Sequence, residues 1–156
     1  MPKEIERKFL VKDDSWRALA GEGKAYRQGY LSLDKERIVR VRVVGEMAVI
    51  TIKGARHGNT ALEYEYPLPL FDAEEMLQNL CVPPLIEKVR YEVMHSGLKW
   101  EVDVFSGENA GLIVAEVELE DAGQHVELPP WAGDEVSDDR RYANASLVLH
   151  PYSKWQ

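Results

Sequence analysis

Charged residues occupy every second position in most of the strand-like segments of this chain. In the first segment Glu4, Glu6 and Lys8 fall at alternate positions, with Ile5 and Phe9 among the residues between them. Because successive side chains of a strand point to opposite faces, the three charges share one face. A single strand of this kind is more often the solvated face of an antiparallel sheet. The remaining strands decide whether that interpretation holds for the whole chain.

The same period of two recurs along the chain, and the sign of the charge is sorted by strand. The later basic positions are Arg40, Arg42, Lys53, Lys88 and Arg90. The later acidic positions are Glu63, Glu65, Glu101, Asp103, Glu116, Glu118 and Glu120. A flat solvated sheet has no reason to sort its charges in this way, so we expect these faces to point into an enclosed lumen.

The fold class follows from the number of strands. Strands are expected near residues 3–11, 25–33, 37–44, 47–53, 61–68, 86–94, 98–105 and 112–120. Eight antiparallel strands can close into a barrel wide enough for one small ligand. We therefore predict a mainly β fold with a few helices (α+β): an eight-stranded antiparallel closed barrel with a charged lumen and short helices packed outside.

Helical signals are few. Asp72–Glu75 resembles a capping box that starts a helix running to Leu80, and residues 13–19 suit a turn or two. Ser137 or Asp138 is expected to cap a C-terminal helix that runs to Leu149. Residues 53–59 are expected to form a mobile loop, and Arg141 a surface salt bridge.

Composition excludes several classes of function. Apolar and charged contents of 45% and 29% are typical of globular proteins. No apolar run approaches the ~20 residues that span a bilayer, so we expect a cytoplasmic protein without a membrane partner. A net charge of −8 argues against broad nucleic-acid binding. The lone Cys81 and four scattered histidines do not suggest a disulfide, thiolate or zinc site. A homodimer is left open.

The chemistry of the expected lumen points to phosphate and a hard metal ion. Clustered carboxylates without His or Cys suit Mg²⁺ or Mn²⁺ rather than zinc. Guanidinium and ammonium groups beside them suit phosphate oxygens. Acids, bases and a divalent cation together are the components of phosphoryl-transfer sites.

An ordered series of motifs sharpens this interpretation. It comprises Glu4-Ile5-Glu6-Arg7-Lys8, Gln28-Gly29-Tyr30, Arg40-Val41-Arg42, Thr51-Ile52-Lys53, Glu63-Tyr64-Glu65-Tyr66, Lys88-Val89-Arg90-Tyr91, Trp100-Glu101-Val102-Asp103, Glu116-Val117-Glu118-Leu119 and Val136-Ser137-Asp138-Asp139 with Arg141-Tyr142 and Asn144. The series resembles the triphosphate tunnel metalloenzymes, also called the CYTH domain family. The resemblance covers nearly the whole chain and implies that residues 1–156 form a single CYTH/triphosphate tunnel domain.

The resemblance also implies roles for individual residues. The triphosphate would be held by Lys8, Arg40, Arg42, Lys53, Lys88 and Arg90. The catalytic residues would be Lys8, Glu4, Glu6 and Arg90, and the metal ligands for Mg²⁺ or Mn²⁺ would be Glu4, Glu6, Glu116 and Glu118. Supporting residues would be Glu63, Glu65, Asp103 and Tyr30. The choices between Glu63 and Glu65, between Glu101 and Glu120, and between a lumen and a packing position for Tyr30 stay open.

The leading function is metal-dependent hydrolysis of inorganic triphosphate, a small-molecule substrate. The chain has little beyond the tunnel and no obvious added nucleoside-binding element. The alternatives are a class IV-type adenylate cyclase, a thiamine or nucleoside triphosphatase, and a non-enzymatic polyphosphate or nucleotide sensor.

Overall fold

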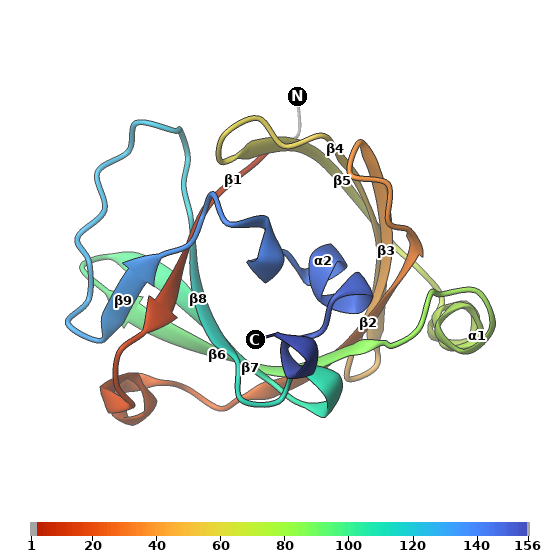
Figure 1. Cartoon of the computed structure of the whole chain (residues 1–156), viewed down its shortest axis with the longest axis horizontal. Helices are drawn as coiled ribbons and strands as arrows, with labels where there is room; N and C mark the ends of the chain where they lie inside the picture. The colour runs from red at the N-terminus through yellow and green to blue at the C-terminus, as the bar shows by residue number, and fades with distance from the viewer. Residues whose placement is uncertain (1–2, 156) are drawn as a thin grey trace.

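The computed structural model describes residues 3–155, in which antiparallel strands close into a barrel (Figure 1). The barrel strands are β1 (Lys3–Val11), β2 (Lys24–Ser32), β3 (Arg37–Val44), β4 (Met47–Gly54), β5 (Thr60–Pro67), β6 (Ile86–His95), β7 (Leu98–Phe105) and β8 (Ile113–Glu118). They are ordered β5-β4-β3-β2-β6-β7-β8-β1, and β1 returns to β5. The predicted eight-stranded antiparallel closed barrel is therefore confirmed. The predicted domain ends, residues 1 and 156, lie outside the described residues.

Strand β1 closes the barrel with one edge divided between two partners. Its first residues pair with β5, from Lys3 opposite Leu62 to Ile5 opposite Thr60. Further along the same edge it pairs with a short ninth strand, β9 (Ala132–Glu135). The sequence analysis missed β9, because Ala, Gly, Asp and Glu lack the β-branched and aromatic side chains that favour strands.

Between these two pairings the edge of β1 is completed by loops. The backbone N–H of Glu6 donates to the carbonyl of Asn59 at 3.1 Å. The backbone N–H of Lys8 donates to Oγ of Ser137 at 2.9 Å. We call this part of β1, from Glu6 to Lys8, the seam. The link between β4 and β5 therefore lies directly beside the charged residues of β1.

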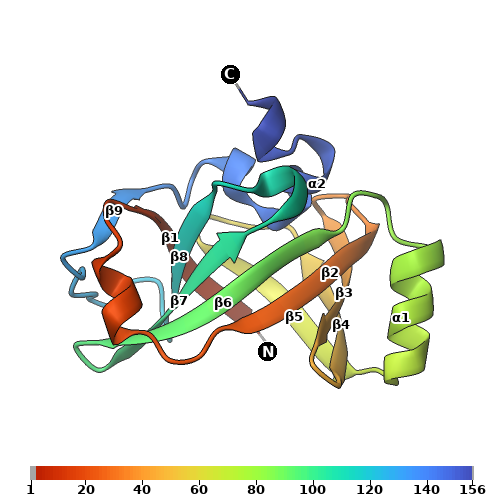
Figure 2. The ribbon, with the colours of Figure 1, turned by 90° about the horizontal axis from the view of Figure 1, so that it is seen from below.

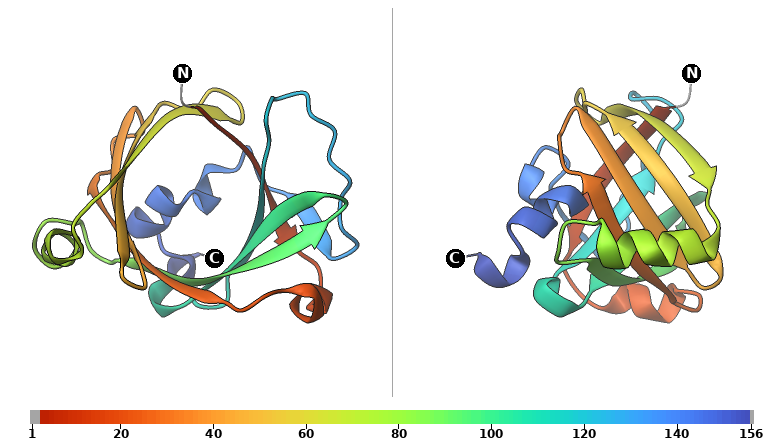
Figure 3. Two further views of the ribbon diagram at one scale, coloured as in Figure 1. Left: turned by 180° about the vertical axis from the view of Figure 1, so that it is seen from behind. Right: turned by 90° about the vertical axis from the view of Figure 1, so that its right-hand side faces the viewer.

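Helix α1 (Leu70–Asn79) packs outside the barrel wall, as predicted (Figures 2 and 3). Its buried residues Ala73 and Leu77 contact Val41 and Val43 of β3. The predicted capping box is wrong: the helix begins before Asp72, at Leu70, and has no side-chain cap. Asp72 instead lies in the first turn, where its negative charge interacts favourably with the helix dipole.

An aromatic cluster covers another part of the outer wall. Phe9 and Trp100 lie 5.4 Å apart between ring centroids, and Trp100 and Trp131 lie 5.6 Å apart. Trp16, from the 3-10 turn Ser15–Leu19, is fully buried in the same cluster. Large rings supplied by loops and a short turn thus cover the strands where the chain has no helix.

The C-terminal helix differs from the prediction in both extent and place. A 3-10 turn (Arg140–Tyr142), capped by Asp139, is followed by an extended Ala143 and then by α2 (Asn144–Leu149). Helix α2 lies over one mouth of the barrel rather than against its outer wall (Figures 1 and 2). The reason is that the wall is apolar at this end, where Ile86, Phe105 and Val114 share a core with Leu147 and Val148.

The remaining short elements are the 3-10 turns Gly107–Asn109 and Tyr152–Lys154. None of the helices within residues 3–155 is long and apolar enough to span a membrane.

Candidate active site

Alternate side chains of the barrel strands surround a cavity of about 440 Å³. Of the residues proposed from the sequence, those that line it are Glu4, Glu6, Lys8, Tyr30, Arg40, Arg42, Lys53, Glu63, Glu65, Lys88, Arg90, Glu116 and Glu118. Both Glu63 and Glu65 are included, and so is Glu101. Glu120 follows the last residue of β8, is exposed and does not line the cavity. Asp103 lies behind the lining, fully buried.

Asp103 holds two basic side chains in place. Its Oδ1 accepts from Nε of Arg90 at 2.7 Å, and its Oδ2 accepts from Nη2 of Arg90 at 2.8 Å. The same Oδ2 accepts from Nζ of Lys88 at 2.7 Å. Glu101 adds a contact of 3.3 Å to Nη1 of Arg90. The bidentate pairing fixes the plane of the Arg90 guanidinium.

The surroundings of Lys88 bring the pKa of its ammonium group close to neutral pH. Burial lowers the pKa of Lys88 to about 7; Asp103 opposes this shift, whereas Arg90 and Arg42 add to it. An ammonium among other cations is stabilised by any further negative charge. This part of the wall is therefore suited to a polyanion.

A hydrogen-bonded chain links the basic wall to α2. Nε of Arg42 donates to Oε1 of Gln28 at 2.8 Å, and Nε2 of Gln28 donates to Oδ1 of Asn144 at 3.1 Å. Oδ1 of Asn144 also accepts from Nζ of Lys88 at 3.0 Å. The first residue of α2 thus fixes two strands of the lumen.

Two tyrosines of β2 also belong to the site. The Tyr26 ring lies between two guanidinium groups, with the Cζ atoms of Arg42 and Arg90 at 4.9 and 5.0 Å from its centroid. Tyr30 is buried, and its hydroxyl accepts from Nε2 of Gln28 at 3.3 Å. The sequence analysis missed Tyr26, although it shares a strand face with Gln28 and Tyr30, which was the signal available.

The Arg40 guanidinium has more hydrogen-bond donors than it has partners among the described residues. Its Nη2 donates to Oγ1 of Thr51 at 3.0 Å and to Oε2 of Glu65 at 3.4 Å. Its Nε is buried and has no hydrogen-bond partner among residues 3–155. Burial, with the charges of Arg40 and Arg90, lowers the pKa of neighbouring Arg42 to about 10. Buried donors without partners are rare in native proteins and indicate a bound ligand or water.

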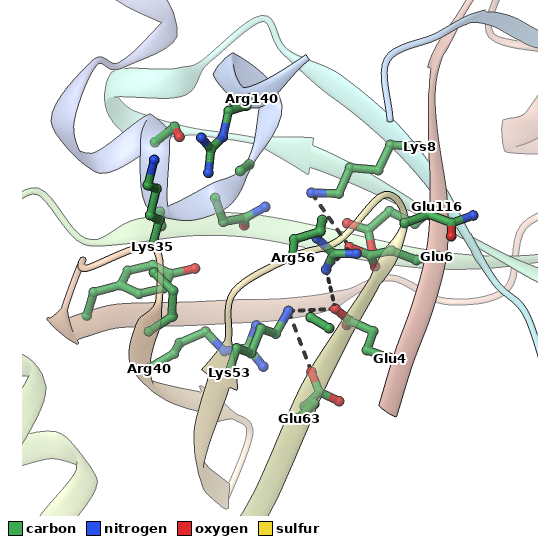
Figure 4. A pocket seen from close by; sticks show the side chains of 18 of the residues that line it. Glu4, Glu6, Lys8, Lys35, Arg40, Lys53, Arg56, Glu63, Glu116 and Arg140 are labelled. Atoms are coloured by element: carbon green, nitrogen blue, oxygen red, sulfur yellow. Dashed lines mark hydrogen bonds and ion pairs between the residues drawn. The ribbon is translucent and has the colours of Figure 1, made fainter. Parts of the chain in front are cut away.

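Carboxylates gather on the facing wall, where β1 pairs with β8 and β5 (Figure 4). In the β1–β8 register Glu6 is opposite Glu118, and Lys8 is opposite Glu116. Glu4 lies at the β1–β5 pairing, where its Oε1 accepts from Nζ of Lys53 at 2.9 Å.

The carboxylates differ in how well their charge is balanced. Burial, Glu116 and Glu4 raise the pKa of Glu6 to about 7, because Nζ of Lys8 stands 3.8 Å away and compensates only in part. Burial also favours a raised pKa for Glu4, but Lys53 and Arg56 outweigh it and lower the pKa of Glu4 to about 2. Burial, Glu4 and Glu65 raise the pKa of Glu63 to about 6 despite Lys53. Negative charge is therefore in excess around Glu6.

Sequence analysis missed Arg56, which lies in the segment expected to be a mobile loop. Its Nη2 donates to Oε1 of Glu4 at 2.7 Å and to Oε1 of Glu6 at 3.4 Å (Figure 4). The segment is tied down by a backbone bridge between His57 and Thr60 and by the carbonyl of Asn59 at the seam. No periodicity identifies an inward side chain in a loop, so the sequence carried no signal for it.

Two exposed cations, Lys35 and Arg140, line the cavity away from the Glu4–Glu6 pair (Figure 4). Arg141 forms the expected surface salt bridge, with Asp139 at 2.7 Å. Exposed pairs of this kind contribute little to stability.

The acidic wall fits a hard divalent cation. Its donors are carboxylates only, and the excess negative charge around Glu6 favours a bound cation. In residues 3–155 no three acidic, His or Cys side chains converge into a ready-made metal site. The carboxylates Glu4, Glu6, Glu116 and Glu118 all line the cavity but would have to move closer together to share one cation.

The fold and the lumen together define a closed barrel whose cavity is lined by alternating basic and acidic side chains. The CYTH domain family model matches residues 2–150 of this chain. The chain belongs to the CYTH domain family.

Two curated relatives match all or nearly all of the chain. An inorganic triphosphatase of Acetivibrio thermocellus is 47% identical over 156 residues, which is 100% of this chain and 99% of the relative. An inorganic triphosphatase of Nitrosomonas europaea is 38% identical over 154 residues, 94% of this chain and 97% of the relative. The crystal structure of the inorganic triphosphatase NE1496 aligns with a TM-score of 0.66 at 37% identity and covers 96% of both chains.

Proposed function

We propose that this protein is a metal-dependent inorganic triphosphatase that hydrolyses linear triphosphate to pyrophosphate and orthophosphate inside the barrel. The observation that carries the proposal is the cavity of about 440 Å³, which is lined by the carboxylates Glu4, Glu6, Glu116 and Glu118 together with six basic residues: Lys8, Arg40, Arg42, Lys53, Lys88 and Arg90. The two curated relatives, both named inorganic triphosphatases, support the same substrate.

The basic residues bind the phosphoryl groups. Arg40 has an unpartnered Nε among the described residues, and Nζ of Lys8 has only a distant contact of 3.8 Å to Glu6. These donors, with Arg42 and Lys88, suit the oxygens of a triphosphate. Arg90, held by Asp103, stabilises negative charge on the transferred and leaving groups together with Lys8.

The carboxylates Glu4, Glu6, Glu116 and Glu118 hold the divalent cation, Mg²⁺ or Mn²⁺. A bound divalent cation supplies positive charge to the phosphoryl oxygens and makes a water molecule more acidic. Glu63 and Glu65 keep Lys53 and Arg40 oriented, at 3.5 and 3.4 Å respectively. The raised pKa of Glu6, about 7, reflects its burial and the neighbouring carboxylates Glu116 and Glu4, and a bound cation would relieve this repulsion.

The adenylate cyclase alternative requires different chemistry. Cyclisation needs a ribose hydroxyl to attack the α-phosphorus and releases pyrophosphate, whereas hydrolysis of inorganic triphosphate needs no nucleoside. The lumen is lined mainly by charged side chains, which suit phosphoryl groups. Inorganic triphosphate therefore loses no interaction by lacking the nucleoside.

The deciding experiment is product analysis by phosphorus NMR with inorganic triphosphate, ATP and thiamine triphosphate, each with Mg²⁺ or Mn²⁺. We expect pyrophosphate and orthophosphate from inorganic triphosphate, much slower turnover of the other two, and no cyclic AMP. Cyclic AMP as the main product, with inorganic triphosphate intact, would establish the cyclase instead. Binding of every triphosphate without turnover would establish a sensor.

Three sequence-based expectations remain proposals. Residues 1–156 act as one tunnel domain, and the protein is cytoplasmic. Apart from the substrate, the one partner proposed is a second copy of the chain, in a homodimer.

A further inference from the structure

Arg56 brings a second positive charge to Glu4, whose first partner is Lys53 of β4. On the lumen face of β5, Ala61 precedes Glu63 and Glu65, and in the β1–β5 register Ala61 is opposite Glu4. Ala61 has no charge to offer Glu4. Arg56 reaches the same carboxylate from the loop, beside the seam (Figure 4).

Arg56 differs from Lys53 and Arg90, the strand-borne cations near it, in its attachment and exposure. Its side chain is 31% exposed, against 18% for Lys53 and 10% for Arg90. The other two are carried by barrel strands, whereas Arg56 lies between β4 and β5. The loop backbone is anchored at Asn59 and at the His57–Thr60 bridge, so the side chain can turn while the backbone stays in place.

Arg56 shares the charge balance of Glu4 with Lys53. Oε1 of Glu4 accepts from Lys53 at 2.9 Å as well as from Arg56 at 2.7 Å. Glu6 has Arg56 at 3.4 Å and Lys8 at 3.8 Å. These two carboxylates are also proposed ligands of the divalent cation. Arg56 contacts Oε1 of each carboxylate, and a divalent cation drawn to the same two negative charges is repelled by the guanidinium, so the binding of either weakens the binding of the other.

We propose that Arg56 is an exchangeable counter-charge: it occupies Glu4 and Glu6 when the tunnel is empty and turns to a terminal phosphoryl group when the divalent cation takes the two carboxylates. The inference rests on the proposed function. A released guanidinium has five donors in a planar fork that matches phosphate oxygens bidentately. Arg56 is then a substrate-binding residue that also competes with the metal.

The test compares Arg56→Ala with Arg27→Ala in the full chain. Arg27 is a matched control, because it is an exposed arginine whose ion pair, with Glu74 of α1, lies outside the barrel. The first measurement is Mn²⁺ binding without any triphosphate, by electron paramagnetic resonance of the free ion. We expect Arg56→Ala to bind Mn²⁺ at least about fivefold more tightly than the wild type, and Arg27→Ala to bind it equally.

The second measurement is the affinity for a non-hydrolysable analogue of inorganic triphosphate, without metal and with Mg²⁺, by calorimetry with all the proposed metal ligands intact. We expect Arg56→Ala to weaken triphosphate binding about tenfold in the presence of Mg²⁺, because charge-assisted hydrogen bonds are lost. Without metal the loss should be smaller, since Arg56 is then still engaged with Glu4 and Glu6.

Arg56→Lys separates charge from geometry and serves as the test if the alanine variant fails to fold. It should keep the competition with Mn²⁺ but bind triphosphate less well, since an ammonium cannot form the bidentate contact. Unchanged Mn²⁺ affinity, or unchanged triphosphate affinity with Mg²⁺ present, would show a fixed structural ion pair and overturn the inference. If the wild type itself binds no triphosphate, the proposed function fails rather than this inference alone.

Discussion

Asp103 satisfies two buried cations with one carboxylate. Its side chain and that of Lys88 are each 1% exposed, and Arg90 is 10% exposed. A buried charge is costly when its partner is removed, because water cannot replace the partner. The geometry of the proposed phosphate site therefore depends on this residue, although it does not line the cavity.

Asp103→Asn should lower the free energy of unfolding by about 3 kcal/mol, since Lys88 and Arg90 lose their shared counter-charge. Urea denaturation measures the change. Glu92→Gln is the control, because Glu92 pairs with Lys99 at 3.4 Å with both side chains more than half exposed. Added triphosphate should restore part of the loss. Equal effects of the two substitutions would contradict this account of Asp103.

Lys88 should make triphosphate binding dependent on pH. Its pKa of about 7 in the empty tunnel leaves it mostly neutral at higher pH, and a polyanion beside it raises that pKa. Binding at about pH 8 should therefore take up a proton, and uptake at about pH 6 should be smaller because Lys88 is already charged. Calorimetry in two buffers of different ionisation enthalpy measures the uptake. Lys88→Met should remove this contribution, and persistence of the full uptake would assign it to another group.

Lys88 also affects folding stability with a definite sign. Its pKa is lower in the folded than in the unfolded chain, so the unfolded chain binds more protons between the two values. The contribution of Lys88 to stability consequently improves as pH rises above about 7.

At the scale of elements, α2 does more than cover a mouth of the barrel. It starts with Asn144, whose Oδ1 accepts from both Gln28 and Lys88. The packing of Leu147 and Val148 on the apolar end of the wall determines where this amide lies.

Asn144→Ala should weaken triphosphate binding about tenfold with little loss of fold, because the buried donors of Gln28 and Lys88 lose their acceptor. Isothermal calorimetry measures the affinity, and circular dichroism checks the fold. Gln78→Ala, at an exposed position of α1, should leave the affinity unchanged. Wild-type affinity in Asn144→Ala would mean that α2 only covers the barrel.

The strands of the barrel were predictable, whereas the parts that complete it were not. Inward charges such as Arg40 and Glu116 mark their strands by a period of two, so local sequence was sufficient. Strand β9 has no side-chain pattern and exists only because β1 offers it a free edge. The position of α2 depends on apolar residues far away in sequence, including Ile86 and Phe105. Arg56 enters the lumen from a loop, where no periodicity applies.

At the scale of the whole molecule, the lumen concentrates like charges that a polyanion relieves. Ligand that binds only the native state stabilises it by about 2.7 kcal/mol at a hundredfold excess over its dissociation constant. Triphosphate should therefore raise the melting temperature far more than sulfate does, even without metal. Arg42→Ala should remove most of this difference. Differential scanning calorimetry measures it, and an unchanged difference in the variant would place the ligand elsewhere.

One edge of β1 pairs with both β5 and β9, and this pairing affects when the barrel can close during synthesis of the chain. As the chain leaves the ribosome, β1 emerges first, but β8 (Ile113–Glu118) and β9 (Ala132–Glu135) emerge more than a hundred residues later. Pairings of such wide sequence separation form late and slowly. Glu6 meets Glu118, and Lys8 meets Glu116, only after more than a hundred further residues have been made. A nascent chain therefore has no enclosed lumen until β1 has been joined by β8, and the proposed site exists only in molecules whose barrel has closed.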